Sequence, residues 1–331
     1  MTIHQTTLRP ASPAPLLRTL VSLLVPVFNE QEAVSAFLTE IDRVFAPLKA
    51  AYDYEVVFVN DGSRDATEFV IRSRMVDNPH VHLINLSRNF GKEAALSAAI
   101  DHAKGDVCIP IDVDLQDPPE VIPQMLELWA KGAQIVNARR ANRTQDSWIK
   151  RKTAQGFYRV FNALAEHSIP QDVGDFRLLD RQVVDVLRDM NERVRFNKAL
   201  FSWVGFETEE VSFDRPERQA GSSAWTYWKL WNLALDGIFS SSTVPLRIWT
   251  YAGGSLALMA FLYAAVLFFR TLVVGVDVPG YASTMITILM FGGLNLFAIG
   301  IVGEYIARIY SEVRERPLYV LRSIHNPGGQ S

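Results

Sequence analysis

Two long uncharged runs near the carboxyl end constrain the fold of this chain most strongly. Residues 249–269 contain no charged side chain, and neither do residues 281–303. A helix needs roughly 20 apolar residues to cross the hydrocarbon core of a bilayer, so each run is long enough to span it. Charged residues bound both runs, namely Arg247, Arg270, Asp277 and Glu304. We therefore expect two transmembrane helices within residues 248–304, rather than two buried helices of a soluble core.

Basic residues around these runs predict the orientation of the chain in a membrane. The connector between the runs has Arg270 as its single basic residue. The flanking segments are richer in positive charge and carry Lys229, Arg247, Arg308, Arg314, Arg316 and Arg322. Because cytoplasmic loops carry an excess of lysine and arginine, both termini are expected in the cytoplasm. The sequence thus predicts an integral membrane protein whose amino-terminal domain lies in the cytoplasm.

Composition excludes several other classes of protein. The 331 residues are 49% hydrophobic and 21% charged, with a net charge of −3. This balance is too apolar for a disordered chain and supplies no basic field for nucleic acid. The single cysteine, Cys108, excludes an internal disulfide, and its apolar neighbours predict a buried side chain. Residues 1–18, which contain three prolines, are expected to form a loose leader.

The first half of the chain alternates short apolar runs with helical stretches. Strands are expected at 20–27, 54–60, 81–86, 106–112 and 133–138, and helices at 31–45, 65–76, 92–104 and 119–131. Such alternation predicts an α/β fold with a mostly parallel sheet, whose ligands bind at the carboxyl ends of the strands.

The segment between this region and the first long run is less regular. A helix is expected at 150–164, a strand or loop at 174–179 and a helix at 180–190. Trp225, Trp228 and Trp231 follow near helical spacing within residues 224–239. Tryptophan beside a membrane span favours an amphipathic helix at the interface, although packing against the soluble domain remains open.

A pair of carboxylates at the end of an expected strand is the strongest chemical signal. Asp112 and Asp114 are two residues apart, so a strand places them on the same side, and Gln116 follows. Two carboxylates this close repel each other unless a cation lies between them. Oxygen ligands favour Mg²⁺ or Mn²⁺, which would hold a diphosphate and take up its charge as it leaves. A solvated turn is the alternative.

Two further strand ends have the residues to hold a nucleotide. Asp61 and Ser63 follow the second expected strand, where an acidic side chain can accept hydrogen bonds from a base or ribose. Lys92 enters a helix, where it could meet phosphate beside free backbone N–H groups. A tight turn with a helix cap at Asp65 is the alternative for the first. The glycine-rich fingerprints of dinucleotide and P-loop sites are absent.

Four motifs together give the chain a family resemblance. They are Pro26-Val27-Phe28-Asn29-Glu30, Asn60-Asp61-Gly62-Ser63, Arg88-Asn89-Phe90-Gly91-Lys92 and Asp112-Val113-Asp114-Leu115-Gln116, extended by the run 172–181. In combination they resemble family-2 glycosyltransferases, and more narrowly the polyprenyl-phosphate type, which includes bactoprenol glucosyltransferases and dolichol-phosphate mannose synthases. The resemblance covers roughly residues 20–322.

The resemblance implies a GT-A fold, a nucleotide-sugar donor and an inverting reaction. It also implies a place in the bacterial inner membrane, with the catalytic domain in the cytoplasm. Asp112, Asp114 and Gln116 match the metal ligands, and Asp175, Asp112 and Asp114 the catalytic acids. The expected donor-nucleotide residues are Pro26, Phe28, Asn29, Glu30, Asp61, Ser63, Lys92, Asp112 and Val113. Asp175 would orient the sugar or the acceptor-binding arginines, since a phosphate acceptor is already ionised. A structural ion pair of Asp175 with Arg177 or Arg181 is the alternative.

The acceptor phosphate of such an enzyme needs local cations, which two basic clusters supply. Arg139, Lys150, Arg151, Arg215 and Arg218 are the candidates, although any single one is an ordinary surface charge more often than a ligand. The expected reaction is transfer of a hexose, glucose from UDP-glucose, to undecaprenyl phosphate for modification of a cell-envelope glycan. GDP-mannose or a UDP-aminosugar as donor remains open, and so does a non-catalytic membrane scaffold that binds a nucleotide sugar.

These expectations divide the chain into five parts. A leader at 1–18 precedes the GT-A domain at 19–218 and juxtamembrane amphipathic helices at 219–247. Two transmembrane helices at 248–304 lead into a cytoplasmic tail at 305–331. The expected partners are the nucleotide sugar, the polyprenyl phosphate, the membrane and further copies of the chain in a homo-oligomer, with no nucleic acid.

Overall fold

A computed structural model gives the fold of most of the chain. The structure describes residues 18–141, 173–190, 192, 197–214, 244–274 and 280–327. The expected helix at 150–164 and the expected interfacial helix at 224–239 lie outside these ranges.

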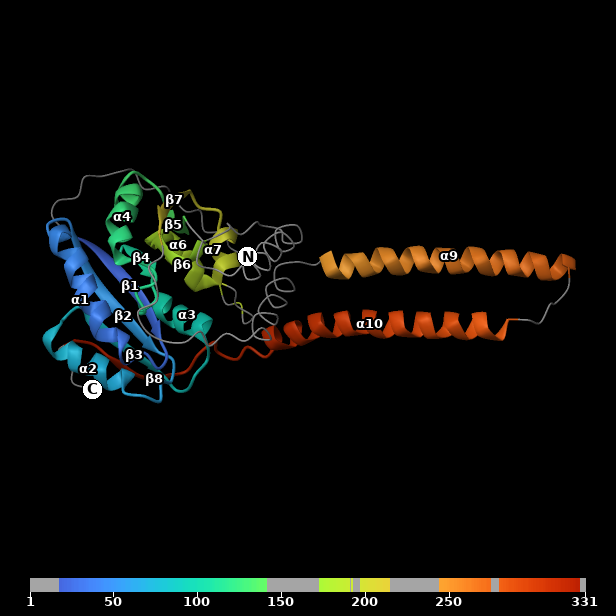
Figure 1. Cartoon of the computed structure of the whole chain (residues 1–331), viewed down its shortest axis with the longest axis horizontal. Helices are drawn as coiled ribbons and strands as arrows, with labels where there is room; N and C mark the ends of the chain where they lie inside the picture. The colour runs from blue at the N-terminus through green and yellow to red at the C-terminus, as the bar shows by residue number, and fades with distance from the viewer. Residues whose placement is uncertain are drawn as a thin grey trace.

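Within the described residues, a single eight-stranded sheet forms the centre of the amino-terminal domain (Figure 1). Its strand order is β7-β5-β6-β4-β1-β2-β3-β8. The strands are β1 Thr19–Val27, β2 Tyr52–Asn60, β3 Val81–Leu86, β4 Val107–Pro110, β5 Ile135–Arg140, β6 Val173–Asp180, β7 Thr208–Phe213 and β8 Leu321–His325. The helices are α1 Ala33–Phe45, α2 Thr67–Asp77, α3 Lys92–His102, α4 Ile122–Ala130, α6 Arg181–Asp189, α7 Asn197–Trp203, α9 Val244–Val274 and α10 Tyr281–Val313.

Most neighbouring strands are parallel, as the alternation of strands and helices predicts. Strand β1 lies between β2 and β4 and is parallel to both, and β3 continues the parallel set beyond β2. Strand β6 is antiparallel to its neighbours β4 and β5, and β8 is antiparallel to β3. The expected α/β fold with a mostly parallel sheet is therefore confirmed, with two reversed strands added to it.

Helices cover both faces of the sheet because its central strands are apolar on both sides. Leu23 of β1 belongs to the core cluster that includes Phe37 of α1, whereas the next residue, Leu24, belongs to the cluster that includes Ala95 of α3. All four side chains are fully buried. Strands buried on both faces are apolar along most of their length, as is usual in parallel sheets. Cys108 lies in the second cluster, and its burial raises the pKa of the thiol to about 12.

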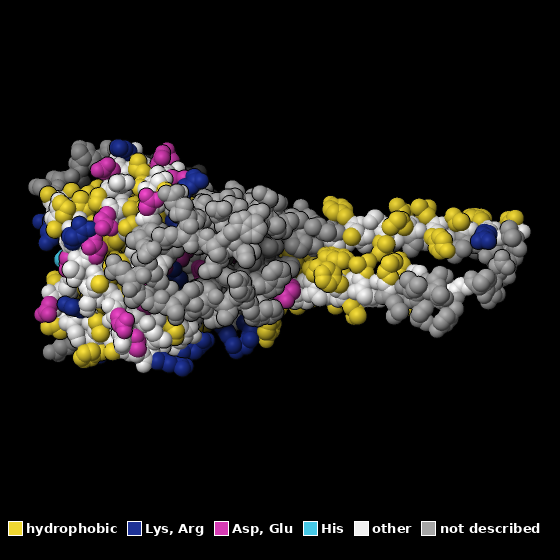
Figure 2. Space-filling model, viewed as in Figure 1, with side chains coloured by type: hydrophobic (Ala, Val, Ile, Leu, Met, Phe, Trp, Pro, Cys, Tyr) yellow, Lys and Arg dark blue, Asp and Glu magenta, His cyan; other side chains and the backbone are white. Residues whose placement is uncertain are grey.

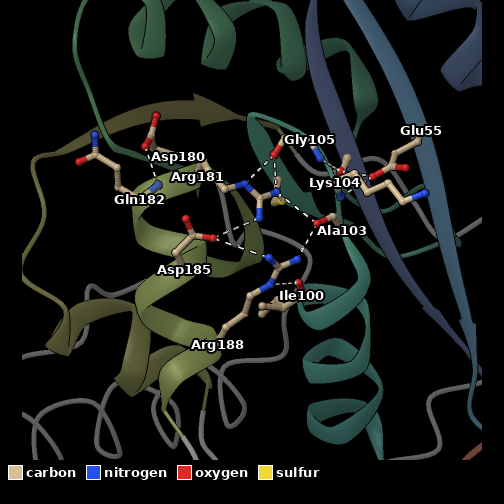
Figure 3. A network of polar contacts seen from close by, with 12 residues as sticks. Glu55, Ile100, Ala103, Lys104, Gly105, Asp180, Arg181, Gln182, Asp185 and Arg188 are labelled. Carbon is tan, nitrogen blue, oxygen red and sulfur yellow. Dashed lines mark hydrogen bonds and ion pairs between the residues drawn. The ribbon is translucent and has the colours of Figure 1, made fainter. Parts of the chain in front are cut away.

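Two arginines of helix α6 fix the carboxyl end of helix α3 (Figure 3). Arg181 donates to the carbonyl oxygens of Gly105 and Ala103, and Arg188 donates to those of Ile100 and Ala103. The last carbonyls of a helix lack partners within the helix, and cations near them are favourable. These contacts anchor α3 at the end remote from Lys92, its first residue.

Helices α9 and α10 project side by side from the domain, as Figure 1 shows. The ring of Trp249 meets that of Phe297 edge-on, with 5.1 Å between centroids. Within the described residues, the segment Met290–Val313 is long and apolar enough to cross a membrane. Helix α10 continues to Val313, beyond the expected end at residue 303.

The carboxyl end of the chain returns to the sheet after α10. The expected tail at 305–331 contains strand β8, which pairs with β3 and forms one edge of the sheet. Helix α7 and strand β7 are further elements that the sequence pattern did not indicate. The segment 174–179, left open between strand and loop, is part of strand β6.

Candidate active site

The carboxyl ends of the parallel strands gather the expected site residues at one edge of the sheet. Asn29, Asp61 and Lys92 follow or lie just beyond β1, β2 and β3, and Asp112 follows β4. Strand β6 runs the opposite way, so its first residues lie at this same edge. Continuing its register with β4, in which Cys108 pairs with Leu179, places Asp175 opposite Asp112. The antiparallel strand thus brings Asp175, which is distant in the sequence, close to Asp112 in the predicted metal-binding motif.

Hydrogen bonds join the loops after β1 and β2 to each other. The backbone N–H of Asn29 donates to the hydroxyl of Ser63 at 3.0 Å, and the N–H of Arg64 donates to the side-chain oxygen of Asn29 at 2.8 Å. Asn29 has a positive φ of 56°, which turns the chain sharply after β1. Two expected donor residues, Asn29 and Ser63, therefore lie together. Their hydrogen bonds hold the loops after β1 and β2 together at this edge of the sheet.

Gly62 lets the second loop approach the third. Its φ is +70°, and a Cβ atom at this position would lie 2.5 Å from the carbonyl carbon of Arg88 and 2.6 Å from the nitrogen of Asn89. Real Cβ atoms do not come this close to backbone, so only glycine fits. The loops after β2 and β3 are consequently in direct contact.

Asp61 holds the loop that leads into helix α3. Its two carboxylate oxygens accept from the backbone N–H groups of Phe90 at 2.7 Å and Gly91 at 2.9 Å. Burial raises the pKa of this carboxyl group, and the two hydrogen bonds offset only part of the increase. Each oxygen retains a second lone pair. The structure thus gives Asp61 a structural role alongside the expected role in nucleotide binding.

Lys92 joins the two acids that the resemblance assigns to catalysis. Its Nζ atom lies 2.7 Å from Oδ1 and 2.9 Å from Oδ2 of Asp112, and 2.9 Å from Oδ2 of Asp175. Burial would lower the pKa of Lys92, but the charges of Asp175 and Asp112 outweigh burial and raise it. Lys92 is therefore a permanent cation between two carboxylates. The sequence predicted a phosphate as the partner of Lys92, whereas the structure shows the carboxylates of Asp112 and Asp175.

The alternative role of Asp175 is a structural ion pair with Arg177 or Arg181. Arg181 lies past the far end of β6, where it donates to the carbonyl of Gly105, so it is not the partner of Asp175. Arg177 donates to the carbonyl of Gly174 at 2.7 Å and stacks over the ring of Phe201. The contact with Lys92 places Asp175 beside the motif after β4, and an ion pair of Asp175 with Arg177 stays the alternative.

The loop after β4 presents oxygen atoms suited to a divalent cation. A positive φ of 58° at Leu115 bends this loop, and Asp114 accepts from the backbone N–H of Gln116 at 3.1 Å. No group of three or more acidic, histidine or cysteine side chains forms a metal cluster within the described ranges. A Mg²⁺ site often uses only one or two carboxylates and leaves the rest to substrate phosphates. Asp112, Asp114 and Gln116 fit a site of that kind, and the ammonium beside Asp112 shows that this position favours positive charge.

The remaining donor candidates differ in exposure. Phe28 is 43% exposed and can contact a ligand, whereas Val113 is only 3% exposed and packs in the core, so only its backbone is accessible. Pro26 lies within β1, where it pairs with Val59. The backbone N–H of Glu30 donates to the hydroxyl of Thr67. The first turn of α2 is also ordered by Asp65, which accepts from Thr67, although the helix cap itself is Ala66.

Among the acceptor candidates, the structure describes Arg139 alone. Arg139 pairs with Glu210 of β7 at 3.1 Å. Lys150, Arg151, Arg215 and Arg218 lie outside the described ranges. The neighbouring Arg140 lies 3.7 Å from Asp117, which follows the metal-type motif. Arg140 is therefore a cation beside the site. The sequence places it in the same basic cluster as Arg139, whereas its proximity to Asp117 depends on the fold.

Two family models match this chain, in two separate regions. Residues 22–188 match the model of Glycosyl transferase family 2, and residues 244–309 match the GtrB C-terminal hairpin. The chain is 51% identical over 305 residues to the SfII prophage-derived bactoprenol glucosyl transferase of Shigella flexneri, covering 92% of this chain and 98% of that one. It is 49% identical over 304 residues to a prophage bactoprenol glucosyl transferase homolog of Escherichia coli K12, covering 92% and 99%.

Among solved structures, a mannosyltransferase of Pyrobaculum calidifontis in complex with GDP-Man and Mn²⁺ aligns with a TM-score of 0.45 and 18% identity. The alignment covers 92% of this chain and 89% of that one. The family matches extend over the catalytic domain and over the hairpin α9–α10 as separate units. The chain belongs to Glycosyl transferase family 2 and is a glycosyltransferase with a GT-A-like domain followed by a GtrB-type hairpin.

Proposed function

We propose that this enzyme transfers a hexose from a nucleoside diphosphate sugar to a polyprenyl phosphate, with inversion at the sugar carbon. The observation that carries the proposal is the cluster of Asp112, Lys92 and Asp175 at the carboxyl edge of the sheet. Relatives named bactoprenol glucosyl transferases align with nearly the whole chain, which supports a bactoprenol phosphate, undecaprenyl phosphate, as the acceptor and glucose as the sugar.

The donor would bind across the loops after β1, β2 and β4. Asn29, Asp61 and Ser63 would contact the nucleoside, since their loops form one connected surface. Asp112, Asp114 and Gln116 would hold Mg²⁺ or Mn²⁺, which neutralises the diphosphate as the sugar leaves it. UDP-glucose is the donor proposed, because it is the ordinary activated form of glucose.

Asp175 and the nearby cations would organise the reacting groups. A phosphate acceptor is ionised at neutral pH, so its oxygen can attack the sugar carbon without a general base. Asp175 would then orient the sugar or a cation that binds the acceptor. Arg139 and the basic residues outside the described ranges, Lys150, Arg151, Arg215 and Arg218, are the proposed acceptor ligands.

The hairpin would place this chemistry at the cytoplasmic face of the membrane. Strand β8 pairs with β3, so the chain returns to the catalytic domain after helix α10. If the hairpin of α9 and α10 is inserted in a bilayer, its two antiparallel helices would each cross it, in line with the two uncharged runs of the sequence. Holding the enzyme at the interface avoids moving the lipid tail into water, at about 0.8 kcal/mol per methylene. We propose a homo-oligomer as the working form.

The test is a transfer assay with purified full-length protein in detergent. Undecaprenyl phosphate and Mg²⁺ would be incubated with radiolabelled UDP-glucose, GDP-mannose or a UDP-aminosugar. We expect one labelled lipid from UDP-glucose. A labelled lipid from another donor would correct the sugar while keeping the reaction. No labelled lipid from any donor, despite nucleotide-sugar binding, would favour a membrane scaffold instead.

A further inference from the structure

The strand that follows the hairpin is connected to the proposed donor site by a chain of side-chain contacts. Strand β8 lies antiparallel to β3, with Ser323 paired with Asn85. Beyond the ladder, the N–H of Ser87 donates to the carbonyl of Val320, and the hydroxyl of Tyr319 donates to Asp101 at 2.6 Å. The segment from α10 to the end of β8 is thus fixed at several points along the edge of the domain.

Tyr319 packs against the core, but the apolar residues of β8 itself contribute little burial to this attachment. Leu321 is 38% exposed and Ile324 is 41% exposed, although both belong to the strand. An edge strand with exposed apolar side chains relies on its backbone ladder and on specific polar contacts. Polar contacts of β8 reach inward from the surface. Arg322 forms an ion pair with Glu68 of helix α2, and Ser323 contacts Asn85 of β3.

Asn85 is the point where this strand meets the interior. Its side chain is fully buried. Its amide nitrogen donates to the hydroxyl of Ser323 at 3.0 Å and to Glu68 at 3.1 Å. A carboxylate only accepts hydrogen bonds, so Glu68 determines which end of the Asn85 amide is the nitrogen. Arg322 in turn holds Glu68.

The orientation of Asn85 continues into the loop after β2. The oxygen of Asn85 accepts from the amide nitrogen of Asn60 at 2.8 Å. The oxygen of Asn60 then accepts from the backbone N–H of Ser63 at 3.0 Å, and the hydroxyl of Ser63 accepts from the N–H of Asn29. Each amide has its nitrogen and oxygen assigned by the previous partner. A change at β8 therefore reaches the loops proposed to hold the nucleoside.

We propose that strand β8 is a positioning element of the donor site, in which Ser323 and Arg322 orient Asn85 and thereby the turn from Asn60 to Ser63. This inference rests on the proposed location of the donor. It gives the segment beyond the membrane hairpin a part in nucleotide binding, in addition to covering the edge of the sheet. Ser323 touches no substrate and acts through Asn85.

The experiment compares Ser323→Ala with Ser311→Ala in the full-length protein. The hydroxyl of Ser311 bonds only to the carbonyl of Ala307 in its own helix among the contacts described, so this variant removes the same group without touching the domain. Hydrogen exchange would follow the backbone amides of Ser63 and Asn29 without nucleotide. Calorimetry would measure binding of UDP with Mn²⁺, and of GDP with Mn²⁺.

We expect Ser323→Ala to speed exchange at Ser63 and to weaken binding of the preferred nucleotide by about fivefold, as for partial loss of one hydrogen bond. Ser323→Thr keeps the hydroxyl and should restore both values, and Ser311→Ala should change neither. Unchanged exchange at Ser63 together with faster exchange in β8 would overturn the proposal and leave β8 as an edge cover. Binding of neither nucleotide by the wild type would contradict the proposed function, while the exchange data would still decide the coupling.

Discussion

The catalytic domain and the hairpin differ in the exposure of their apolar side chains: the domain buries them, and the hairpin exposes them. Leu23 and Phe58 in the sheet are fully buried, whereas Leu296 and Phe297 of α10 are 71% and 61% exposed. Figure 2 shows apolar side chains distributed along the projecting helices, away from the domain. Exposed apolar area costs about 25 cal/mol per Å² in water, so a hairpin of this kind needs an apolar environment. The domain contains its own core, and the hairpin depends on its surroundings.

This difference explains how the two regions share one task. The domain can hold charged groups such as Lys92 and Asp112 in fixed geometry because buried strands position them. The hairpin is apolar along its length, and we propose that it places the domain beside a lipid. Substitutions in the two regions should therefore have distinct consequences. Those at the strand ends should affect chemistry, and those on the helices should affect insertion.

The largest effect is expected at the strand end of the domain. Asp112→Asn should lower transfer by about 10³-fold or more, because the metal and Lys92 both lose the charge they bind. EDTA should reproduce the loss in the wild type, and Mg²⁺ or Mn²⁺ should reverse it. Formation of labelled lipid measures the effect. Asp77→Asn, at the exposed end of α2, is the control and should retain activity. Full wild-type activity in EDTA would refute the metal assignment.

Asp175→Asn should lower turnover by about 10²-fold while nucleotide affinity changes little, as expected for a positioned group that acts on the reacting atoms. Steady-state turnover and UDP binding, measured on the same preparation, separate the two effects. The folded domain should persist, since Asp175 lies at the end of its strand. Turnover near that of the wild type would make Asp175 structural.

An arginine introduced at an exposed apolar position should have different effects in the two regions. Leu296→Arg places a charge on an exposed position of α10, and Phe69→Arg does so on α2, where the side chain is 73% exposed. An arginine within a bilayer costs about 2.5–3.5 kcal/mol, whereas one on a wet surface changes stability by about 0.5 kcal/mol or less. Leu296→Arg should reduce the fraction of protein retained in membranes after carbonate washing. Equal retention of both variants would show that α10 is not a span.

The sequence predicted the parts of this molecule that depend on local pattern. Apolar runs located the first five strands, and the pair Asp112 and Asp114 located the metal-type loop, because both signals lie within a few residues. Strand β8 has no such signal, since its apolar residues Leu321 and Ile324 are partly exposed and its partners on β3 are more than 200 residues away.

Lys92 shows the same limit within the site. Its place at the start of a helix indicated a phosphate ligand, which is a local inference. Its position between Asp112 and Asp175 depends on the antiparallel pairing of β6 with β4, whose register no sequence pattern revealed. The contact adds a structural question, namely whether this ammonium competes with a metal for Asp112.

The smallest predicted effect answers that question. Lys92→Met removes a cation that lies 2.7 Å from Asp112, so a divalent ion no longer has to displace it. Mn²⁺ should then bind the nucleotide-free protein about fivefold more tightly, because the ammonium and the metal are two cations that compete for one carboxylate. Electron paramagnetic resonance of free Mn²⁺ measures this affinity without any turnover.

Two controls separate this effect from a general change in charge. Lys92→Arg keeps the cation and should leave Mn²⁺ affinity near that of the wild type. Lys104→Met removes an exposed positive charge past the opposite end of α3, and it should also leave the affinity unchanged, because screening by salt weakens a charge at that distance. Weaker Mn²⁺ binding by Lys92→Met would contradict competition between the ammonium and the metal. Lys92 would then favour metal binding by holding Asp112 and Asp175 together. In that case the metal site would depend on the same pairing of β4 with β6 that positions Asp175.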